Sequence, residues 1–487
     1  MKKINRRTVT VAMMVATVLA AIESTIVSTA MPTIVSELGG LQLISWVVAV
    51  YLLTSAVTTP IYGKLADLFG RKIIFTVGAI LFLLGSMLSG MAHSMTELIW
   101  FRAFQGIGAG AILPITFTII GDIYTHEERA KIQGVFSGIW GISGILGPLA
   151  GGFLVDYVSW RWIFYINIPF GIVAIIMLWT SLHETVEKKR KYVDYPGVLS
   201  FTIGMTALLY ALLTGGTQYS WSSNTIISLF LLSAISLCLF LYIQTKSPDP
   251  MLPLSLFRIR VIAISNLAGF LVSAILIAIT VYLPLWIQGV YGQGATNSGL
   301  TLIPLSIGWP IGAAVGGRIM VKLGGKMTSC MGTSALFIGS LVLGFIGNDT
   351  PHWVLTSAMF VMGLGFGFAI TTFTVSVQSA VSWQLRGAAT ASSTFLRTLG
   401  QTVGIAVFGT LFNHKIAEYL SAHQNVLKQG MDMNKLFNPH LSRNISEKAL
   451  EVMREAIAVG LHQIFLLVLG LSIIGLVVCM ALPRKVC

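Results

Sequence analysis

The amino-acid sequence predicts an all-α polytopic membrane protein with fourteen transmembrane helices, built as two six-helix bundles with two further helices between them. The chain of 487 residues is 55% hydrophobic and only 10% charged, whereas soluble domains carry roughly a quarter charged residues. Apolar runs of about 18 residues or more, long enough to cross a bilayer core as a helix, recur along the whole chain. The charged residues stand mainly in the short gaps between these runs.

The predicted spans follow one another closely. The first is too long for a signal peptide and lacks its small-residue cleavage site, so we expect it to stay in the mature protein. The spans are approximately 9–35, 45–66, 73–92, 97–121, 131–155, 162–181, 195–214, 225–245, 262–289, 298–320, 328–347, 353–378, 388–412 and 457–482.

The distribution of lysine and arginine predicts the orientation of the chain. Nearly all of them stand in the odd-numbered gaps and at the two ends, whereas the other gaps before residue 412 hold only Arg161. The positive-inside rule therefore places both termini in the cytoplasm. The same distribution explains the net charge of +13 without nucleic acid, because the basic residues flank apolar segments and form no single stripe.

The last outer gap, 413–456, departs from this pattern with six basic and five acidic residues. Long translocated loops contribute little to orientation, so the gap does not overturn the assignment. Ser446 is a possible N-cap for a short amphipathic helix that would end near Ala456.

The spans group as six, two and six. We expect a first bundle over 1–182, a linker with two extra helices over 183–260, and a second bundle over 261–487. The stretch Gly63–Lys72 after the second span has an echo in Gly316–Lys326, after the second span of the second half. Repeated halves around a midplane site are the architecture of many secondary transporters.

The stretch Gly63-Lys-Leu-Ala-Asp-Leu-Phe-Gly-Arg-Lys72 places one acid, Asp67, among three bases in a tight turn that needs Gly63 and Gly70. Asp67 can accept hydrogen bonds from Arg71, Lys72 or the positive end of a nearby helix. Such a cluster can latch one conformation and release in another, and the alternative is a plain basic loop that only sets topology.

This stretch resembles the cytoplasmic loop signature of the major facilitator superfamily. Three further stretches resemble its fourth-helix motif, its fifth-helix antiporter motif and a signature of the branch of drug:proton antiporters with fourteen spans. They are Arg102-Ala-Phe-Gln-Gly-Ile-Gly-Ala-Gly110, Gly141-Ile-Ser-Gly-Ile-Leu-Gly-Pro-Leu-Ala-Gly-Gly152 and Trp160-Arg-Trp-Ile-Phe-Tyr-Ile-Asn-Ile-Pro169. The second half matches less sharply, since Val321 and Gly325 stand where the first loop has Asp67 and Arg71.

Glu23 is the candidate proton carrier. It lies midway along the first span with no lysine or arginine within a turn or two, and burial of a carboxylate favours its protonated form. The alternative is a structural hydrogen-bonding acid. The resemblance implies that Arg102 takes part in proton transfer, so we expect Arg102 to modulate the protonation of Glu23. Snorkelling of Arg102 to the outer surface is the alternative.

Small residues on the fifth span predict close helix packing. Gly144, Gly147 and Gly151 recur at three- and four-residue spacing, and Pro148 allows a bend. The resemblance implies that this motif, with Gly152, forms a bending interface associated with exporters, although ordinary membrane packing also explains the glycines.

Six further residues are candidates for the wall of a substrate cavity. Aromatic walls with few acids suit bulky amphiphilic cations, although tryptophan also favours membrane borders and Arg397 could snorkel to the cytoplasmic surface. The six are Gln105, Trp140, Asn167, Trp286, Trp309 and Arg397; Asn266 is a weaker polar candidate.

Taken with the resemblance, these residues predict a proton-driven exporter of hydrophobic or cationic molecules that works by alternating access in a bacterial cytoplasmic membrane. A dedicated exporter of one metabolite, lipid or signalling molecule, and a non-transporting membrane sensor, are the alternatives. Enzyme, nucleotide-binding and cofactor motifs are missing, and four scattered cysteines predict no metal site. We expect a monomer whose partners are small molecules, protons and lipid.

Overall fold

The computed structural model describes residues 5–483 except 125, 183, 185–193, 217, 249, 251, 253, 348–349, 383–384, 424–432 and 438–446. It does not describe the side chains at 24, 60, 64, 67, 68, 126–131, 133–135, 137, 138, 140, 387, 388, 435 and 437. The Asp67 and Trp140 side chains, and the Ser446 cap, therefore lie outside the described part of the chain.

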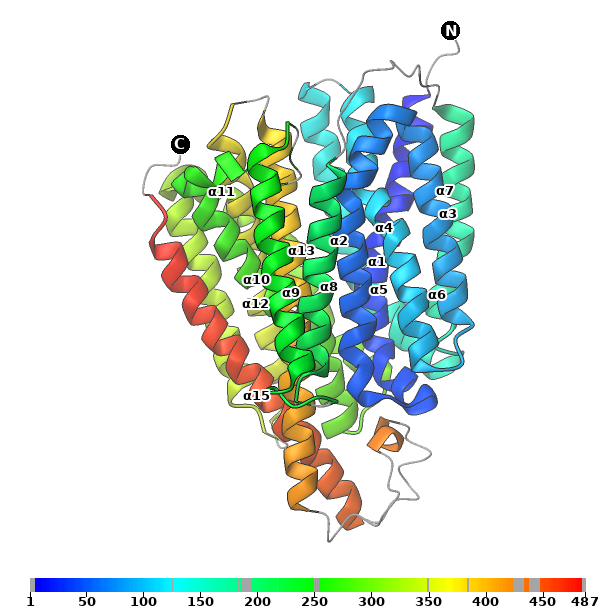
Figure 1. Cartoon of the computed structure of the whole chain (residues 1–487), viewed down its shortest axis with the longest axis vertical. Coiled ribbons are helices and arrows are strands. Elements are labelled where there is room, and N and C mark those ends of the chain that lie inside the picture. The colour runs from blue at the N-terminus through cyan, green and yellow to red at the C-terminus, as the bar shows by residue number, and fades with distance from the viewer. Residues whose placement is uncertain are drawn as a thin grey trace.

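Helices build the fold, and they form two groups joined by a helical hairpin (Figure 1). The first group contains α1 (Arg6–Leu38), η1 (Leu41–Leu43), α2 (Ile44–Phe69), α3 (Arg71–Gly90), α4 (Met95–Ile123), α5 (His126–Tyr157), α6 (Trp162–Tyr165) and α7 (Asn167–Ser181). The hairpin consists of α8 (Tyr195–Thr214) and α9 (Asn224–Lys246). The second group contains η2 (Leu254–Arg258), α10 (Arg260–Leu285), the π-helical η3 (Trp286–Val290), α11 (Ala295–Gly344), α12 (His352–Ser379), α13 (Arg386–Ala422), η5 (Met433–Phe437) and α15 (Glu447–Met480).

Local sequence signals account for several helix ends. Ser94 Oγ accepts from Glu97 N at 3.2 Å, so Ser94 caps the start of α4. The Glu97 carboxylate accepts from the N–H of His93, the residue before the cap, at 2.9 Å. Asp194 caps α8 by accepting from Gly197 N at 3.0 Å. Gly70, with φ 93°, ends α2 and begins α3.

Twelve helical stretches among the described residues are long and apolar enough to cross a membrane. The expected fourteen differ from this count at two places. The predicted spans 298–320 and 328–347 belong to one 50-residue stretch, α11, which Gly324 (φ 80°, ψ 165°) breaks into two helical segments. The 32-residue α5, which covers the predicted span 131–155, is not among the twelve.

Three further boundaries differ from expectation. The predicted span 162–181 is divided into α6 and α7 around Ile166. α13 continues to Ala422 and α15 begins at Glu447, so much of the predicted loop 413–456 is helical and extends beyond the bundle at its lower end (Figure 1). Hydropathy predicted only the apolar part of these two helices, because their projecting turns are polar.

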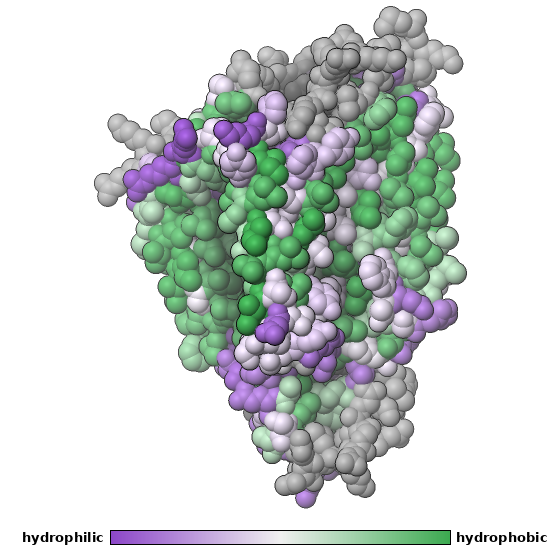
Figure 2. All heavy atoms as spheres, viewed as in Figure 1, coloured by the Kyte–Doolittle hydropathy of each residue, from purple (hydrophilic) through white to green (hydrophobic). Residues whose placement is uncertain are grey.

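Apolar side chains cover the middle of the molecule, and polar side chains gather near its lower end (Figure 2). α1 begins and α15 ends at the upper end (Figure 1), which we call the termini end. Of the buried apolar clusters, the largest extends across both groups and includes Ile26, Val47, Tyr282 and Phe408. Two separate clusters, around Phe75 in the first group and Ile262 in the second, lie toward the termini end.

The α8–α9 hairpin touches both groups. On α8, Tyr210 packs edge-on against Trp46 of α2, with ring centroids 5.7 Å apart. Phe201 of α8 packs on Phe395 of α13 at 5.2 Å. α8 therefore lies across the seam between α2 and α13, whereas α9 is the outer helix and exposes residues such as Leu231.

Candidate functional site

A buried polar network occupies the interior of the first group. Glu23 of α1 and Arg102 of α4 form an ion pair, and they are 1% and 3% exposed. Asn167 Nδ2 at the start of α7 donates to Glu23 Oε2 at 2.8 Å. The two carboxylate oxygens of Glu23 therefore have different donors, one from each of two neighbouring helices.

The guanidinium of Arg102 is held on further sides. Its Nη1 also donates to Gln105 Oε1, one turn along α4, at 2.8 Å. The Tyr51 ring of α2 lies 4.0 Å from its Cζ atom, which is cation–π distance. Arg102 Nε and Gln105 Nε2 are buried without a hydrogen-bond partner among the described residues. Three helices thus surround the charge, and two donors still lack a partner.

The structure brings together four of the predicted site residues: Glu23, Arg102, Gln105 and Asn167. The local sequence indicated that Glu23 is isolated from basic residues. The structure shows that it is not, because its cation comes from a residue 79 positions away along the chain. Removing one partner would leave a buried charge, which is strongly unfavourable. The pair can therefore hold the ionised form of Glu23 in one conformation and release it when α1 and α4 move apart.

The stretch 160–169 ties this network to the rest of the first group. Ser86 Oγ of α3 accepts from Asn167 Nδ2 at 2.9 Å and donates to Phe164 O at 2.8 Å. Trp160 Nε1 and Arg161 Nη1 donate to Glu37 at the end of α1, at 2.8 and 3.2 Å. One short segment therefore positions both the middle and the end of α1.

The predicted loop 63–72 makes its described contacts inside the first group. Arg71 forms an ion pair with Asp122 near the end of α4. Lys72 Nζ donates to the carbonyls of Trp179 and Leu182, both at 2.9 Å. The Glu184 carboxylate accepts from the backbone N–H groups of Arg71 and Lys72 at 3.0 Å, which caps the start of α3. No atom lies within 4 Å of a Cβ built on Gly63.

The small residues of α5 face two different helices. A Cβ built on Gly147 or Gly151 would lie within 2.5 Å of a threonine hydroxyl of α1. A Cβ built on Gly152 would lie 2.6 Å from Thr296 Cα of α11, and Ser306 Oγ of α11 donates to Gly144 O at 2.6 Å. The sequence predicted one face of small residues on which another helix packs closely. The structure shows one face inside the first group and one face between the groups.

Pro148 belongs to the second of these faces. A Cβ on Gly299 of α11 would lie 2.3 Å from Pro148 O, so the two backbones meet there directly. This contact places the Gly-Pro motif at the interface that must change if the two groups rock against each other.

The described contacts between the two groups lie in the half of the molecule away from the termini end. We call the end opposite the termini end the far end. The Asp156 carboxylate at the end of α5 accepts from Ala295 N at 3.1 Å and from Thr296 N and Oγ1 at 2.8 and 2.6 Å. It therefore caps the start of α11 across the interface. Gln288 Nε2 donates to Thr29 O at 3.0 Å, and Ser45 Oγ lies 2.9 Å from Tyr282 Oη.

The aromatic candidates of the second group are packed in its core. Trp286 of η3 is 2% exposed and packs on Tyr291 and on Phe465 of α15. Trp309 of α11 stacks on Phe366 of α12, with ring centroids 5.5 Å apart. None of these described contacts reaches the Glu23 network.

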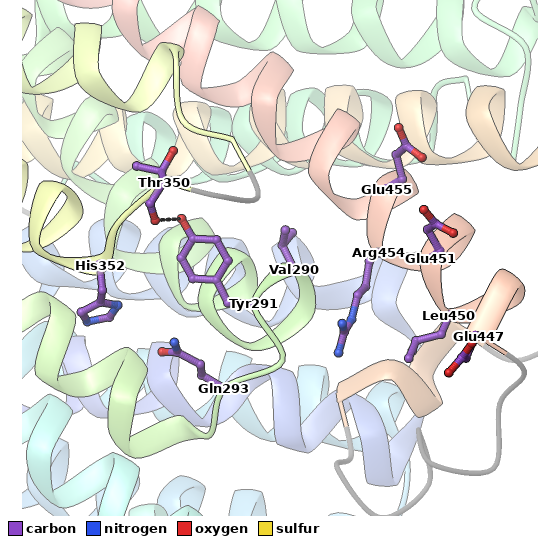
Figure 3. A pocket seen from close by; sticks show the side chains of 10 residues that line it. All are labelled: Val290, Tyr291, Gln293, Thr350, His352, Glu447, Leu450, Glu451, Arg454 and Glu455. Atoms are coloured by element: carbon purple, nitrogen blue, oxygen red, sulfur yellow. Dashed lines mark hydrogen bonds between the residues drawn. The ribbon is translucent and has the colours of Figure 1, made fainter.

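A cavity of about 670 Å³ lies at the far end, between the loop after α10, the start of α12 and the projecting turns of α15 (Figure 3). Tyr291, Gln293 and His352 line one side, and Arg454 lies beside Glu451 on the other. None of its lining residues belongs to the predicted site. The chemistry of the first group is therefore separate from this cavity.

Sequence reasoning missed Tyr51, Ser86 and Asp156. Serine and tyrosine are common in membrane helices, and only the contact with a charged group marks these two. Asp156 had a usable signal, because it is an acid at the end of the antiporter-like motif 141–152 and a span begins near residue 298. The pairing of those two ends is a tertiary feature.

The sequence pattern of the Major Facilitator Superfamily matches residues 13–405. The multidrug transporter protein MdtP of Bacillus subtilis is 36% identical over 489 residues, covering 95% of this chain and 90% of that protein. Multidrug resistance protein 3 of the same organism is 34% identical, covering 96% and 93%. The rubrofusarin-specific efflux pump aurT of Gibberella zeae is 31% identical, covering 85% and 78%.

Solved structures share the fold. A bacterial homologue of the human lysosomal transporter Spinster, in an inward-facing and unoccupied conformation, aligns with a TM-score of 0.69 at 16% identity, covering 98% of this chain and 97% of that chain. The nucleoside transporter NupG aligns with a TM-score of 0.63 at 13% identity, covering 97% and 99%.

Proposed function

Since this chain belongs to the Major Facilitator Superfamily, we propose that it exports amphiphilic small molecules across a bacterial cytoplasmic membrane in exchange for protons. The observation that carries the proposal is the buried pair of Glu23 and Arg102 with Asn167. A charged group inside a membrane helix is expensive and marks a functional site by default. The names of the two Bacillus subtilis relatives support multidrug export.

The pair supplies the proton chemistry. In the described arrangement Arg102 and Asn167 stabilise the ionised carboxylate of Glu23, and a proton that binds there must displace the ion pair. We therefore assign the described conformation to the stage after the proton has left. Movement of α1 relative to α4 would separate the pair and allow Glu23 to take up the next proton.

The contacts between the two groups support alternating access. We propose that the termini end faces the cytoplasm, as the positive-inside rule predicts, and that the far end faces outward. The Asp156 cap and the α5–α11 contact then close the outer side. Proton release and substrate uptake take place from the cytoplasm in this state, which is the order an exporter requires.

We also propose that the chain crosses the membrane fourteen times. α5 has 32 residues, or about 48 Å of helix at a rise of about 1.5 Å per residue. The two segments of α11 on either side of Gly324 each have enough length for a crossing. These two assignments turn twelve candidates into fourteen and keep both termini on one side. Cysteine labelling at Gly324 from each side of the membrane tests them.

The experiment for the function uses proteoliposomes with purified protein and a trapped pH-sensitive dye. A proton gradient is imposed, and a panel of unrelated lipophilic compounds is added. We expect several of them to trigger proton movement, and Glu23→Gln to abolish it. Glu97→Gln is the matched control, because Glu97 is an exposed acid at the start of α4 outside the network, and it should retain proton movement. Unchanged coupling in Glu23→Gln would contradict the proton assignment.

A dedicated exporter is the second candidate, favoured by the relative named as specific for rubrofusarin. In the same assay it would respond to none of the unrelated compounds but to one fraction of cellular metabolites. A correctly folded protein that responds to neither would favour a membrane sensor instead.

A further inference from the structure

In the second group, Arg397 is a half-buried cation that forms no ion pair with an acid among the described residues. It lies eleven residues into α13, about 16 Å from Arg386 along the helix. Its Cγ lies 3.4 Å from a Cβ built on Gly269 of α10, so the side chain lies between these two helices. Its one described hydrogen bond runs from Nη2 to Thr394 Oγ1 on the preceding turn, at 3.3 Å.

The sequence shows why Arg397 finds no acidic partner on α10, α11, α12 or the first part of α13. No aspartate or glutamate occurs between Asp249 and Asp349, or between Asp349 and Glu418. α10, both segments of α11, α12 and most of α13 therefore carry no negative side chain. In the first group, Glu23 is already held by Arg102 and Asn167, and that pair has no net charge. Arg397 is the unbalanced charge in this part of the protein.

Asn266 provides an independent observation on the neighbouring helix. It lies one turn before Gly269, on the same side of α10. It is 1% exposed, and both its Nδ2 and Oδ1 atoms lack a hydrogen-bond partner among the described residues. A buried amide without partners is unfavourable, and such groups are normally satisfied by water or a ligand. Asn266 and Arg397 therefore lie on neighbouring helices near Gly269, and the Asn266 amide has hydrogen-bonding groups that no described residue uses.

The two faces of α13 show that Arg397 does not simply point to lipid. Phe395, two residues earlier, packs on Phe201 of α8. Arg397 faces the opposite way, toward α10, where the same Cβ on Gly269 would lie 4.0 Å from the Phe373 ring of α12. The aliphatic part of the Arg397 side chain thus lies between α13 and Gly269 of α10, with Phe373 of α12 nearby.

We propose that Arg397 and Asn266 form an anion-binding subsite that recognises a carboxylate on an otherwise apolar substrate. A guanidinium matches a carboxylate with two parallel hydrogen bonds, and the Asn266 amide can donate one more. This inference rests on the proposed export function and changes its substrate class, from cations alone to amphiphiles that carry an acid group, including zwitterions.

The test is equilibrium binding to the full-length protein in nanodiscs, measured by fluorescence anisotropy. The probes are a rhodamine dye with a free carboxylate and its methyl ester, which differ only in that group. We expect the wild type to prefer the acid. Arg397→Gln should reduce the ratio of acid to ester affinity by about tenfold, the loss expected for a charge-assisted hydrogen bond. Arg397→Lys should retain part of the preference, and Asn266→Leu should reduce it less than Arg397→Gln does.

Arg260→Gln is the matched control, because Arg260 is exposed at the start of α10, and it should leave the ratio unchanged. Ester binding reports that a variant is folded. An unchanged ratio in Arg397→Gln, an equal loss for both dyes, or no binding of the acid to the wild type would each overturn the subsite. The binding measurement needs no proton gradient, so it is independent of the transport assay. A protein that binds the acid through Arg397 but moves no protons would contradict the export proposal and still support the subsite.

Discussion

The guanidinium of Arg102 in the first group has a carboxylate, an amide oxygen and an aromatic ring around it. The guanidinium of Arg397 in the second group has one threonine hydroxyl. Both lie in membrane-spanning helices, where an unpaired charge is costly. The difference indicates that the charge of Arg102 is balanced within the protein, whereas that of Arg397 is left for the bound carboxylate that we propose.

The comparison predicts opposite effects on stability when each arginine is removed. Arg102→Met would leave the Glu23 carboxylate buried without its cation, a loss of about 3–5 kcal/mol. We expect a clearly lower thermal unfolding midpoint in detergent. The double variant Glu23→Gln with Arg102→Met should recover most of the loss, because no charge remains. A double variant as unstable as the single one would show that packing, not charge, explains the effect.

Asn167, the third member of the Glu23 network, should contribute less to stability than Arg102 does. Asn167→Leu removes a hydrogen bond to a charged group, worth about 1.5–3 kcal/mol, and also leaves Ser86 Oγ with one partner fewer. The unfolding midpoint should fall by less than in Arg102→Met. A fall as large as that of Arg102→Met would make Asn167, and not the cation, the main support of Glu23.

The contact between the two groups gives a smaller effect on conformation. Asp156→Ala removes a helix cap worth about 0.5–2 kcal/mol, and it should shift the population away from the state closed at the far end. Alkylation of a cysteine introduced in place of Ser45, which the described state buries at its contact with Tyr282 of the other group, should become faster. Asp156→Asn, which keeps one acceptor oxygen, should lie between Asp156→Ala and the parent. Equal rates in all three would mean that the cap does not hold this interface.

The smallest expected effect is that of Arg397→Met on stability. Since Arg397 has no acidic partner in the described structure, its removal strands no opposite charge, and the unfolding midpoint should stay the same or rise. This outcome, beside the fall in Arg102→Met, would sharpen the contrast between the two groups. A fall of similar size in both variants would break it, because Arg397 would then stabilise the protein as Arg102 does.

Much of the fold could be predicted from the sequence, because hydropathy is summed over about 20 neighbouring residues and needs no tertiary contact. The first-half motifs led to the family that residues 13–405 match. The prediction of helix boundaries failed where segment length and composition do not determine where a helix ends. The polar turns of α13 remain helical beyond the apolar core, whereas the break at Gly324 falls between Lys322 and Lys326, in the gap predicted between two spans.

The sequence by itself determined which residues are unusual in a membrane: Glu23, Arg102 and Arg397 stand out because they are charged within apolar runs. Only the tertiary structure decided which of them are paired. The Glu23–Arg102 pair joins residues 79 positions apart, and the Asp156 cap on Thr296 joins residues 140 apart. It likewise decided that the glycines of α5 serve two helices and that α8 lies across the seam. Hydropathy is a property of one segment of the chain, whereas the hydrogen-bond partner of a side chain depends on how distant helices pack together.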